Sequence, residues 1–414
     1  MRERWKTVQP SADLIAHAAR RMIQFSEDRW DGAIGFSASA ISRSISVRLG
    51  TDASHARQLP GSTNPSRMTQ NLTIGICVPT VGEQATRNFF DAWRPCWQAQ
   101  RPGLCIRVFV HEDNQTKTLD SSLWRGLEVT YTAQDDIARQ LSGREWIIPK
   151  GSGACRCFPM YLAWKAGCDY IVTLDYDCYP EPEHGGRYLS AHLESFTRDR
   201  WFRTIDGDEA RGIPYERLGK LGVRINHGLW SDVPDLDGPT SLMRMREPRR
   251  VSLRSGHEVV PPGMAFPLCA MNVCYHRSVI PAAYNLLMGL DTAGFDRFDD
   301  IWSGILLKRI LDYKGWYVTT GEPFVRHVKR SNAFTNLRKE ALGIQVHEYL
   351  WEYILDTPIE PGLSVTGAFT VLARRMREFP ERVSAVPCPS GYFPRLADAM
   401  IAWTELFESS IPDP

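Results

Sequence analysis

The chain has 414 residues, and its 49 lysines and arginines nearly balance 48 aspartates and glutamates, giving a formal net charge of +1. This balance excludes a broad nucleic-acid-binding or membrane-binding surface. With 43% hydrophobic and 23% charged residues the composition is that of an ordinary globular protein, and no run of 18 apolar residues predicts a membrane span. The polar start at residues 1–6 is unlike a secretory signal peptide.

Ten cysteines are scattered along the chain without a paired Cys-x-x-Cys zinc pattern. Several of them, Cys77, Cys105 and Cys168, lie in apolar runs, where a thiol behaves as a small hydrophobic group. This usage favours reduced thiols and a cytoplasmic protein.

The first 70 residues form a predicted N-terminal extension and linker. Apolar residues at helical spacing predict a helix over 11–25, and alternation predicts a strand over 41–49. Residues 50–70 lack aromatic side chains and are rich in Gly, Ser, Pro and Asn, which is typical of a linker.

The predicted core begins with an apolar run over 72–80, the first strand of a parallel sheet. The elements predicted after it are a helix over 84–99, strands over 105–110 and 127–132, a helix over 155–167, and a strand over 170–174. Strands that alternate with helices predict an α/β protein with a doubly wound sheet. Further helices are predicted around 301–312, 364–378 and 393–408.

The strand over 170–174 ends in Asp175-Tyr176-Asp177. Two carboxylates at the carboxyl edge of a parallel sheet suit a hard divalent cation that bridges a diphosphate. That arrangement is typical of enzymes that use nucleotide-sugars. The alternative is a plain turn at the end of a strand, since Asp is a good turn residue.

Several short sequence segments elsewhere in the chain support the nucleotide-sugar interpretation. They are CRCF at 155–158, NHGLW at 226–230, VPDLDGPT at 233–240, FPLCAMN at 266–272, RFDDIWSG at 297–304, SNAFTNLRKE at 331–340 and LADAM at 396–400. In this order they resemble the reversibly glycosylated polypeptides of plants, which include the UDP-arabinopyranose mutases. The resemblance covers about residues 72–410.

The resemblance implies a GT-A-like nucleotide-sugar-binding fold, a Rossmann-like mixed sheet over 71–345 with a helical C-terminal extension over 346–414. It also implies a UDP-sugar ligand, with UDP-arabinose favoured, a divalent cofactor, Mn²⁺ or Mg²⁺, and assembly into homo- or hetero-oligomers. Family members become glycosylated on an arginine that matches Arg156. One departure is that Tyr176 replaces the middle of three consecutive aspartates.

Five residues are candidates for binding the nucleotide or the metal, or for acting on the sugar. Asp175 and Asp177 would bind the metal, and Asp175 also the ribose. By analogy with GT-A folds Asp113 would bind uracil or ribose, and Thr80 would lie beside the nucleotide; for both, ordinary loop chemistry is the alternative. Arg156 is either a nucleophile toward the anomeric carbon or a bidentate clamp on the diphosphate.

Asp299 and Asp300 precede an apolar helix. They are either an N-cap with a helix-dipole partner or carboxylates that bind sugar hydroxyls and act as a base.

His327 is a candidate metal ligand, although a lone histidine is more often a satisfied polar residue. Lys329 would neutralise the diphosphate, unless it is simply solvated. His227 and Trp230 would line the sugar pocket, or else belong to the core.

These features favour a UDP-sugar pyranose/furanose mutase with arginine self-glycosylation. Two alternatives stay open: a metal-dependent glycosyltransferase that uses a separate acceptor, and a catalytically silent UDP-sugar-binding partner subunit. Tyr176 keeps the silent partner open, because it removes one carboxylate of the family motif.

Overall fold

The computed structural model describes residues 72–99, 103–182, 185–202, 211–214, 217–244, 255–289, 294–328, 332–382 and 388–408. These residues all belong to the larger of two units of the chain, Met68–Pro414. The helix predicted over 11–25, the strand over 41–49, the linker over 50–70 and the candidate Lys329 lie outside the described residues.

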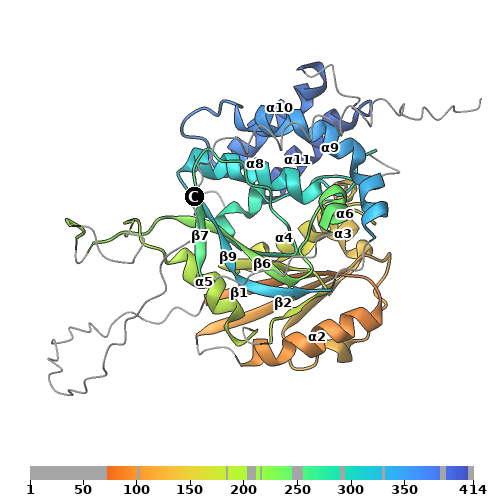
Figure 1. The fold of residues 1–414 in the computed structure, drawn as a ribbon. Coiled ribbons are helices and arrows are strands. Elements are labelled where there is room, and N and C mark those ends of the chain that lie inside the picture. Colours follow the sequence, from red (N-terminus) through yellow and green to blue (C-terminus); the bar gives the residue numbers. More distant parts are fainter. Residues whose placement is uncertain are drawn as a thin grey trace, which may run out of the picture. The chain divides into compact units, whose positions relative to one another are not determined.

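A nine-stranded mixed sheet forms the centre of the described unit (Figure 1), with the order β3-β2-β1-β4-β8-β6-β9-β5 and with β7 paired to β9. Strands β1 to β4 run parallel, and β8 is antiparallel to both β4 and β6. The strands are β1 (Leu72–Thr80), β2 (Leu104–Glu112), β3 (Val129–Thr132), β4 (Tyr170–Leu174), β5 (Cys178–Pro180), β6 (Val223–Asp232), β7 (His257–Val260), β8 (Asn272–His276) and β9 (Tyr317–His327). Because β9 is parallel to β6, the carboxyl ends of β4, β6 and β9 meet at one edge of the sheet.

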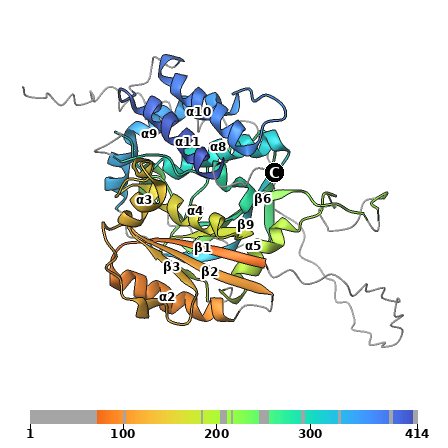
Figure 2. The same ribbon diagram turned by 180° about the vertical axis from the view of Figure 1, so that it is seen from behind.

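Helices cover both faces of this sheet (Figures 1 and 2). They are α2 (Glu83–Gln98), α3 (Gln134–Leu141), α4 (Cys157–Lys165), α5 (Tyr188–Phe196), α6 (Gly238–Arg244), α8 (Asp299–Lys314), α9 (Ala333–Leu355), α10 (Val365–Arg382) and α11 (Tyr392–Glu408). Helices α2 and α5 share one buried apolar cluster with the sheet, and α4, α8, α10 and α11 share the other. Side chains along a strand alternate between faces, so Ile76 and Val78 join the α2 cluster while Cys77 joins the opposite one.

The α2 face fixes the chain just after the Asp-x-Asp turn. Phe89, Phe90, Trp93 and Trp97 of α2 are buried against the sheet, and Trp93 and Trp97 stack with ring centroids 5.7 Å apart. The Trp93 indole N–H donates a hydrogen bond to the Cys178 carbonyl at 2.8 Å. The backbone that follows Asp177 is therefore anchored to a rigid aromatic layer.

The C-terminal helices pack as part of the same unit. Trp403 of α11 stacks on Tyr284 with ring centroids 5.6 Å apart, in the apolar cluster that also contains α4 and α8. The boundary predicted between residues 345 and 346 falls inside α9, because one continuous helix leads from the sheet into the C-terminal helices.

The predicted fold class is confirmed: the described unit is a GT-A-like α/β structure with a mixed sheet and additional C-terminal helices.

Candidate active site

A cleft of about 690 Å³ opens beside the edge where β4, β6 and β9 end, a volume within the range of small-molecule sites. Its acidic lining residues are Asp175, Asp177, Asp235, Asp237, Asp299, Asp300 and Glu340. Its other charged, polar and aromatic lining residues are Arg156, Arg297, His227, His327, Thr320, Tyr176, Trp230 and Phe266. The structure thus brings together the predicted residues Arg156, Asp175, Asp177, His227, Trp230, Asp299, Asp300 and His327.

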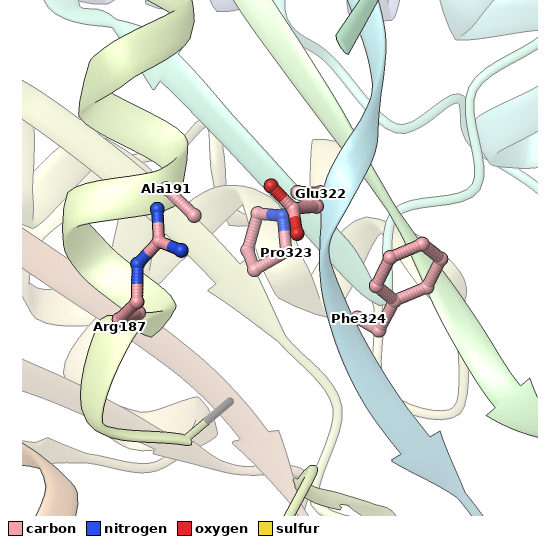
Figure 3. A pocket seen from close by; sticks show the side chains of 5 residues that line it. All are labelled: Arg187, Ala191, Glu322, Pro323 and Phe324. Carbon is pink, nitrogen blue, oxygen red and sulfur yellow. The ribbon is translucent and has the colours of Figure 1, made fainter. Parts of the chain in front are cut away.

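A second hollow between α5 and β9 is far smaller. Figure 3 shows Arg187, the N-cap of α5, and Ala191 of α5 facing Glu322, Pro323 and Phe324 of β9. The space between them is about 10 Å³. That space holds no more than about one water molecule, so it is not a site for a nucleotide.

Arg156 lies at the end of a short 3-10 turn, Gly153–Arg156, that leads directly into α4. Its guanidinium forms a two-point ion pair with Asp175, with Nε–Oδ1 at 3.0 Å and Nη2–Oδ2 at 2.6 Å. Burial alone would lower the pKa of Arg156, but the charge of Asp175 and these hydrogen bonds raise it well above its ordinary value. Arg156 is therefore a cation while this pair is intact.

Asp177 faces His327 across a short gap. The Nδ1 of His327 lies 2.8 Å from the Val233 carbonyl, which only accepts hydrogen bonds, so Nδ1 carries the proton. In the neutral ring the free lone pair is then on Nε2, which lies 3.9 Å from Oδ2 of Asp177. Burial and the charge of Asp175 raise the pKa of Asp177.

The Asp177–His327 pair fits a divalent cation in donor chemistry and spacing. A 3.9 Å separation leaves room for an ion between two ligand atoms at bond lengths of roughly 2.1 Å. Asp175, the third predicted ligand, has both oxygens bonded to Arg156. In the described part of the chain no group of three or more His, Cys, Asp or Glu side chains forms a metal cluster. Phosphate oxygens and water would therefore have to complete the coordination shell.

Asp299 and Asp300 are the first two residues of α8, and the N-cap is Phe298 without a side-chain bond. The N-cap reading of the two aspartates is therefore wrong, although both lie in the first turn, where the helix dipole favours negative charge. Oδ2 of Asp300 accepts a hydrogen bond from the Ala270 amide at 3.1 Å. Burial, with the charges of Asp299 and Asp235, raises the pKa of Asp300 to about 7.

Asp299 is buried against the loop that carries Arg156. A Cβ on Gly153 would lie 1.8 Å from Oδ2 of Asp299, so only glycine allows this approach. Burial raises the pKa of Asp299, and the nearby charge of Arg156 opposes that rise.

His227 of β6 forms part of an aromatic wall. Its Nε2 accepts a hydrogen bond from the Cys269 amide at 3.3 Å, so Nδ1 carries the proton and donates to Thr320 Oγ1 at 3.2 Å. Burial lowers the pKa of His227 to about 4, which keeps the ring neutral. Its ring packs edge-on against Trp230 and Phe266, with centroids 5.7 and 5.3 Å away.

Two predicted nucleotide contacts lie away from the lining of this cleft. The Thr80 hydroxyl is buried and hydrogen-bonded to the Thr86 hydroxyl. Asp113 accepts hydrogen bonds from Gln134 Nε2 at 3.0 Å and from the Gly151 amide at 2.9 Å. Asp113 therefore ties the loop that leads to Arg156 to the end of β2.

Sequence reasoning assigned no role to four other lining residues, Arg297, Asp235, Cys269 and Glu340. Asp235 lies 2.9 Å from the thiol of Cys269, and Arg297 lies 2.7 Å from Glu340. All four fall in strings that carried the family resemblance, but they belong to no recognised catalytic motif. Only the folded structure indicates a role for them, because it brings all four into one cleft.

The mixed sheet and the carboxylate-rich cleft at the end of β4 define a GT-A-type enzyme of the mutase or glycosyltransferase kind. The chain belongs to the family described as "Reversibly glycosylated polypeptide", whose profile matches residues 69–411.

Its relatives carry mutase names. It is 30% identical over 353 residues to "Probable UDP-arabinopyranose mutase 2" of Solanum tuberosum, covering 82% of this chain and 91% of that protein. It is 30% identical over 368 residues to "UDP-arabinopyranose mutase 1" of Oryza sativa subsp. japonica, covering 86% of this chain and 95% of that protein. A solved structure, glucosyl-3-phosphoglycerate synthase from Mycobacterium tuberculosis in complex with Mn²⁺, UDP and phosphoglyceric acid, is 15% identical with a TM-score of 0.39, covering 73% of this chain and 86% of that one.

Among the described residues, no helix combines the length and the apolar character needed to cross a membrane.

Proposed function

We propose that this chain is a UDP-sugar pyranose/furanose mutase whose substrate is UDP-arabinose. Its relatives are named for that reaction, and the chain covers nearly all of their length. The observation that carries the proposal is the meeting, in one cleft, of the Arg156–Asp175 pair and a carboxyl group, Asp300, with a pKa of about 7. Ring contraction needs a group that engages the anomeric carbon and another that moves protons near neutral pH.

A divalent cation, Mn²⁺ or Mg²⁺, would be held by Asp177 and His327. The metal contact of Asp175 stays a prediction, because both of its oxygens are bonded to Arg156. When bound, the cation supplies positive charge that stabilises the departing diphosphate. His227 and Trp230 would form the wall against which the sugar lies. The nucleotide contacts of Thr80 and Asp113 stay predictions, and for Asp113 the two hydrogen bonds to Gln134 and Gly151 support a role in shaping the site.

Arg156 acts on the anomeric carbon. A guanidinium is a poor nucleophile until it loses a proton, and its bonded partner Asp175 is placed to accept that proton from Nη2. The bond between the anomeric carbon and the diphosphate oxygen then breaks, its electron pair leaves with UDP, and a nitrogen–carbon bond to Arg156 forms. This covalent step would be the glycosylation that the family name describes, with Arg156 as the modified residue.

Asp300 handles the protons of the sugar ring. Opening the pyranose breaks the bond from the anomeric carbon to the ring oxygen, which takes up a proton, while the lone pair of the attached Arg156 nitrogen forms a carbon–nitrogen double bond. Closing the furanose joins the neighbouring hydroxyl oxygen to the anomeric carbon, returns that electron pair to the nitrogen and releases the hydroxyl proton. A carboxyl group with a pKa of about 7 exists in both forms near neutral pH and can give the first proton and take the second. UDP then displaces Arg156, which recovers its proton from Asp175.

The cellular setting is part of the proposal. All ten cysteines are free thiols, which supports a reducing compartment and hence the cytoplasm. Assembly into homo- or hetero-oligomers stays a prediction.

One incubation tests the function. Purified protein is mixed with Mn²⁺ and UDP-arabinopyranose, the nucleotides are separated by chromatography, and the intact protein is weighed by mass spectrometry. A new UDP-pentose isomer supports the mutase, and free UDP that appears only with an added acceptor indicates a glycosyltransferase. Bound nucleotide with neither product indicates the silent partner. Tyr176→Asp, which restores three consecutive aspartates, serves as the comparison variant.

A further inference from the structure

The cleft is lined by more acidic than basic side chains, so a diphosphate that enters it needs positive charge to bind. Its acidic lining residues outnumber its two arginines, Arg156 and Arg297. Arg156 directs Nε and Nη2 at Asp175. An anionic ligand entering so acidic a space needs a further cation, and among the lining residues Arg297 is the arginine placed to supply it.

Arg297 is held so that its head faces this space. Its backbone has φ of +64°, a left-handed conformation that is uncommon for a residue other than glycine and that is often found at functional sites. Its Nε donates to Oε1 of Glu340 at 2.7 Å; the Glu340 side chain is 3% exposed, whereas that of Arg297 is 31% exposed. The guanidinium is thus held at Nε, and its terminal N–H groups donate no hydrogen bond to another residue in the described part of the chain, which leaves them for a ligand.

Glu340 joins two borders of the cleft. Its second oxygen, Oε2, accepts a hydrogen bond from the Gly238 amide at 2.5 Å, at the end of the loop that carries Asp235. One buried side chain of α9 therefore fixes both Arg297 and that loop.

The neighbouring residues of α9 strengthen the same support. Lys339 lies 2.9 Å from Asp296, the residue before Arg297. A Cβ on Gly343 would lie 2.4 Å from the ring of Phe298, so α9 and the segment before α8 are in close contact. Arg297 is consequently positioned by a rigid helix and not by a free loop.

We infer that Arg297 is a substrate-binding residue that contacts the diphosphate of the nucleotide-sugar, and that Glu340 is its positioning residue. The inference rests on the proposed function, since it takes the ligand to be a nucleoside diphosphate. A planar guanidinium matches phosphate oxygens in a two-point contact, whereas uracil and the sugar carry no charge. Arg297 lines the same cleft as the Asp177–His327 pair, so one diphosphate can lie between them.

Calorimetric titration with UDP in the presence of Mn²⁺ tests this. Arg297→Gln should weaken UDP binding about tenfold to a hundredfold, the effect of losing a charged hydrogen bond, and should reduce the dependence of affinity on salt. Arg377→Gln is the matched control, because Arg377 pairs with Asp398 between α10 and α11 and lines no part of the cleft. The control should bind UDP as the wild type does.

The Glu340→Gln variant tests whether Glu340 affects UDP binding by positioning Arg297 or by stabilising the cleft as a whole. It should weaken UDP binding less than Arg297→Gln, and the double variant should bind as Arg297→Gln alone, because Glu340 acts through Arg297. Additive losses would overturn the positioning role.

The outcomes separate the two proposals. A wild type that binds no UDP overturns the proposed function together with this inference. A wild type that binds UDP while Arg297→Gln binds within twofold, with the same salt dependence, overturns the inference alone. If Arg297→Gln does not fold, Arg297→Lys is tested instead, because lysine keeps the charge but cannot make a two-point contact with phosphate. Weaker UDP binding by this variant supports the contact, and unchanged binding overturns it.

Discussion

Arg156 and Asp175 form one charge-neutral unit at the end of β4, joined by hydrogen bonds of 3.0 and 2.6 Å. Arg156, the residue that we propose becomes glycosylated, and Asp175, the first carboxylate of the Asp-x-Asp turn, are therefore direct partners. The pair lies in a largely buried place, where the two side chains are 23% and 15% exposed. A substrate that engages one of them must change the bonding of the other.

This pair predicts a strongly non-additive effect on stability. Arg156→Met or Asp175→Asn alone leaves a partly buried charge without its partner, and each should lower the free energy of unfolding by about 2–4 kcal/mol. The double variant should lose less than the sum of the two single losses. Urea denaturation of the wild type and the three variants measures the coupling. A loss in the double variant equal to the sum of the two single losses would show that the pair is not formed in solution.

Asp300 predicts a pH-dependent stability. Its pKa is about 7 in the folded protein and near its ordinary value of 3.8 when unfolded, so the folded state binds the proton more tightly. The stability this proton contributes is fully present below about pH 4 and is lost as the pH rises through 7. Compared with Asp300→Asn, the wild type should therefore lose at least about 1 kcal/mol between pH 5 and pH 8.

The same group should shape the pH dependence of turnover. If Asp300 moves the ring protons, the rate of isomerisation should change near pH 7, and Asp300→Asn should abolish both that inflection and most of the activity. Asp299→Asn is the comparison, because Asp299 packs on the Arg156 loop. Chromatographic initial rates between pH 5 and 9 measure this, and an unchanged profile in Asp300→Asn would remove Asp300 from the mechanism.

Gly153 predicts a local packing limit. Its missing Cβ leaves room for Asp299, since a Cβ would lie 1.8 Å from Oδ2. Gly153→Ala should displace the Arg156 turn, lower the free energy of unfolding by about 1–3 kcal/mol and reduce turnover. Gly186→Ala is the control, because a Cβ there meets nothing within 4 Å. Wild-type stability and turnover in Gly153→Ala would show that the turn adapts at little cost.

Strands β1, β2 and β4 could be predicted because each contains a short apolar run that ends in polar residues. Helix α9 could not, because its first buried residues are Asn336, Glu340 and Gly343, which carry no apolar periodicity. They are buried for specific contacts: Glu340 holds Arg297, and Gly343 meets Phe298. The pairing of residues 297 and 340 spans 43 positions of the chain, and neither local pattern nor spacing indicates it.

For the site, the turn at Asp175 and Asp177 was evident from the sequence, whereas the role of Arg156 came only from the family resemblance. The structure adds that Asp175 is bonded to Arg156, which no spacing rule predicts. His327 is brought to Asp177 by the antiparallel pairing of β5 with β9, in which Cys178 lies opposite His327. That pairing is a long-range property of the sheet, which no local pattern indicates, and His327 was predicted to share a metal with Asp177 only by analogy with GT-A folds.

His327 gives the last prediction. If Asp177 and His327 hold the cation that the diphosphate shares, UDP should bind the wild type more weakly after the metal is removed with a chelator. His327→Ala should bind UDP at that weaker level with or without Mn²⁺, because the imidazole ligand is gone. His276→Ala is the control. His276 bonds to Ser278, and it pairs with Tyr170 at the start of β4, whereas Asp175 follows the end of β4. Calorimetric titration of UDP with and without Mn²⁺ measures all three proteins. If Mn²⁺ strengthens UDP binding to His327→Ala as much as to the wild type, the cation is held elsewhere, and Asp177 with His327 would be a structural contact of β9 alone.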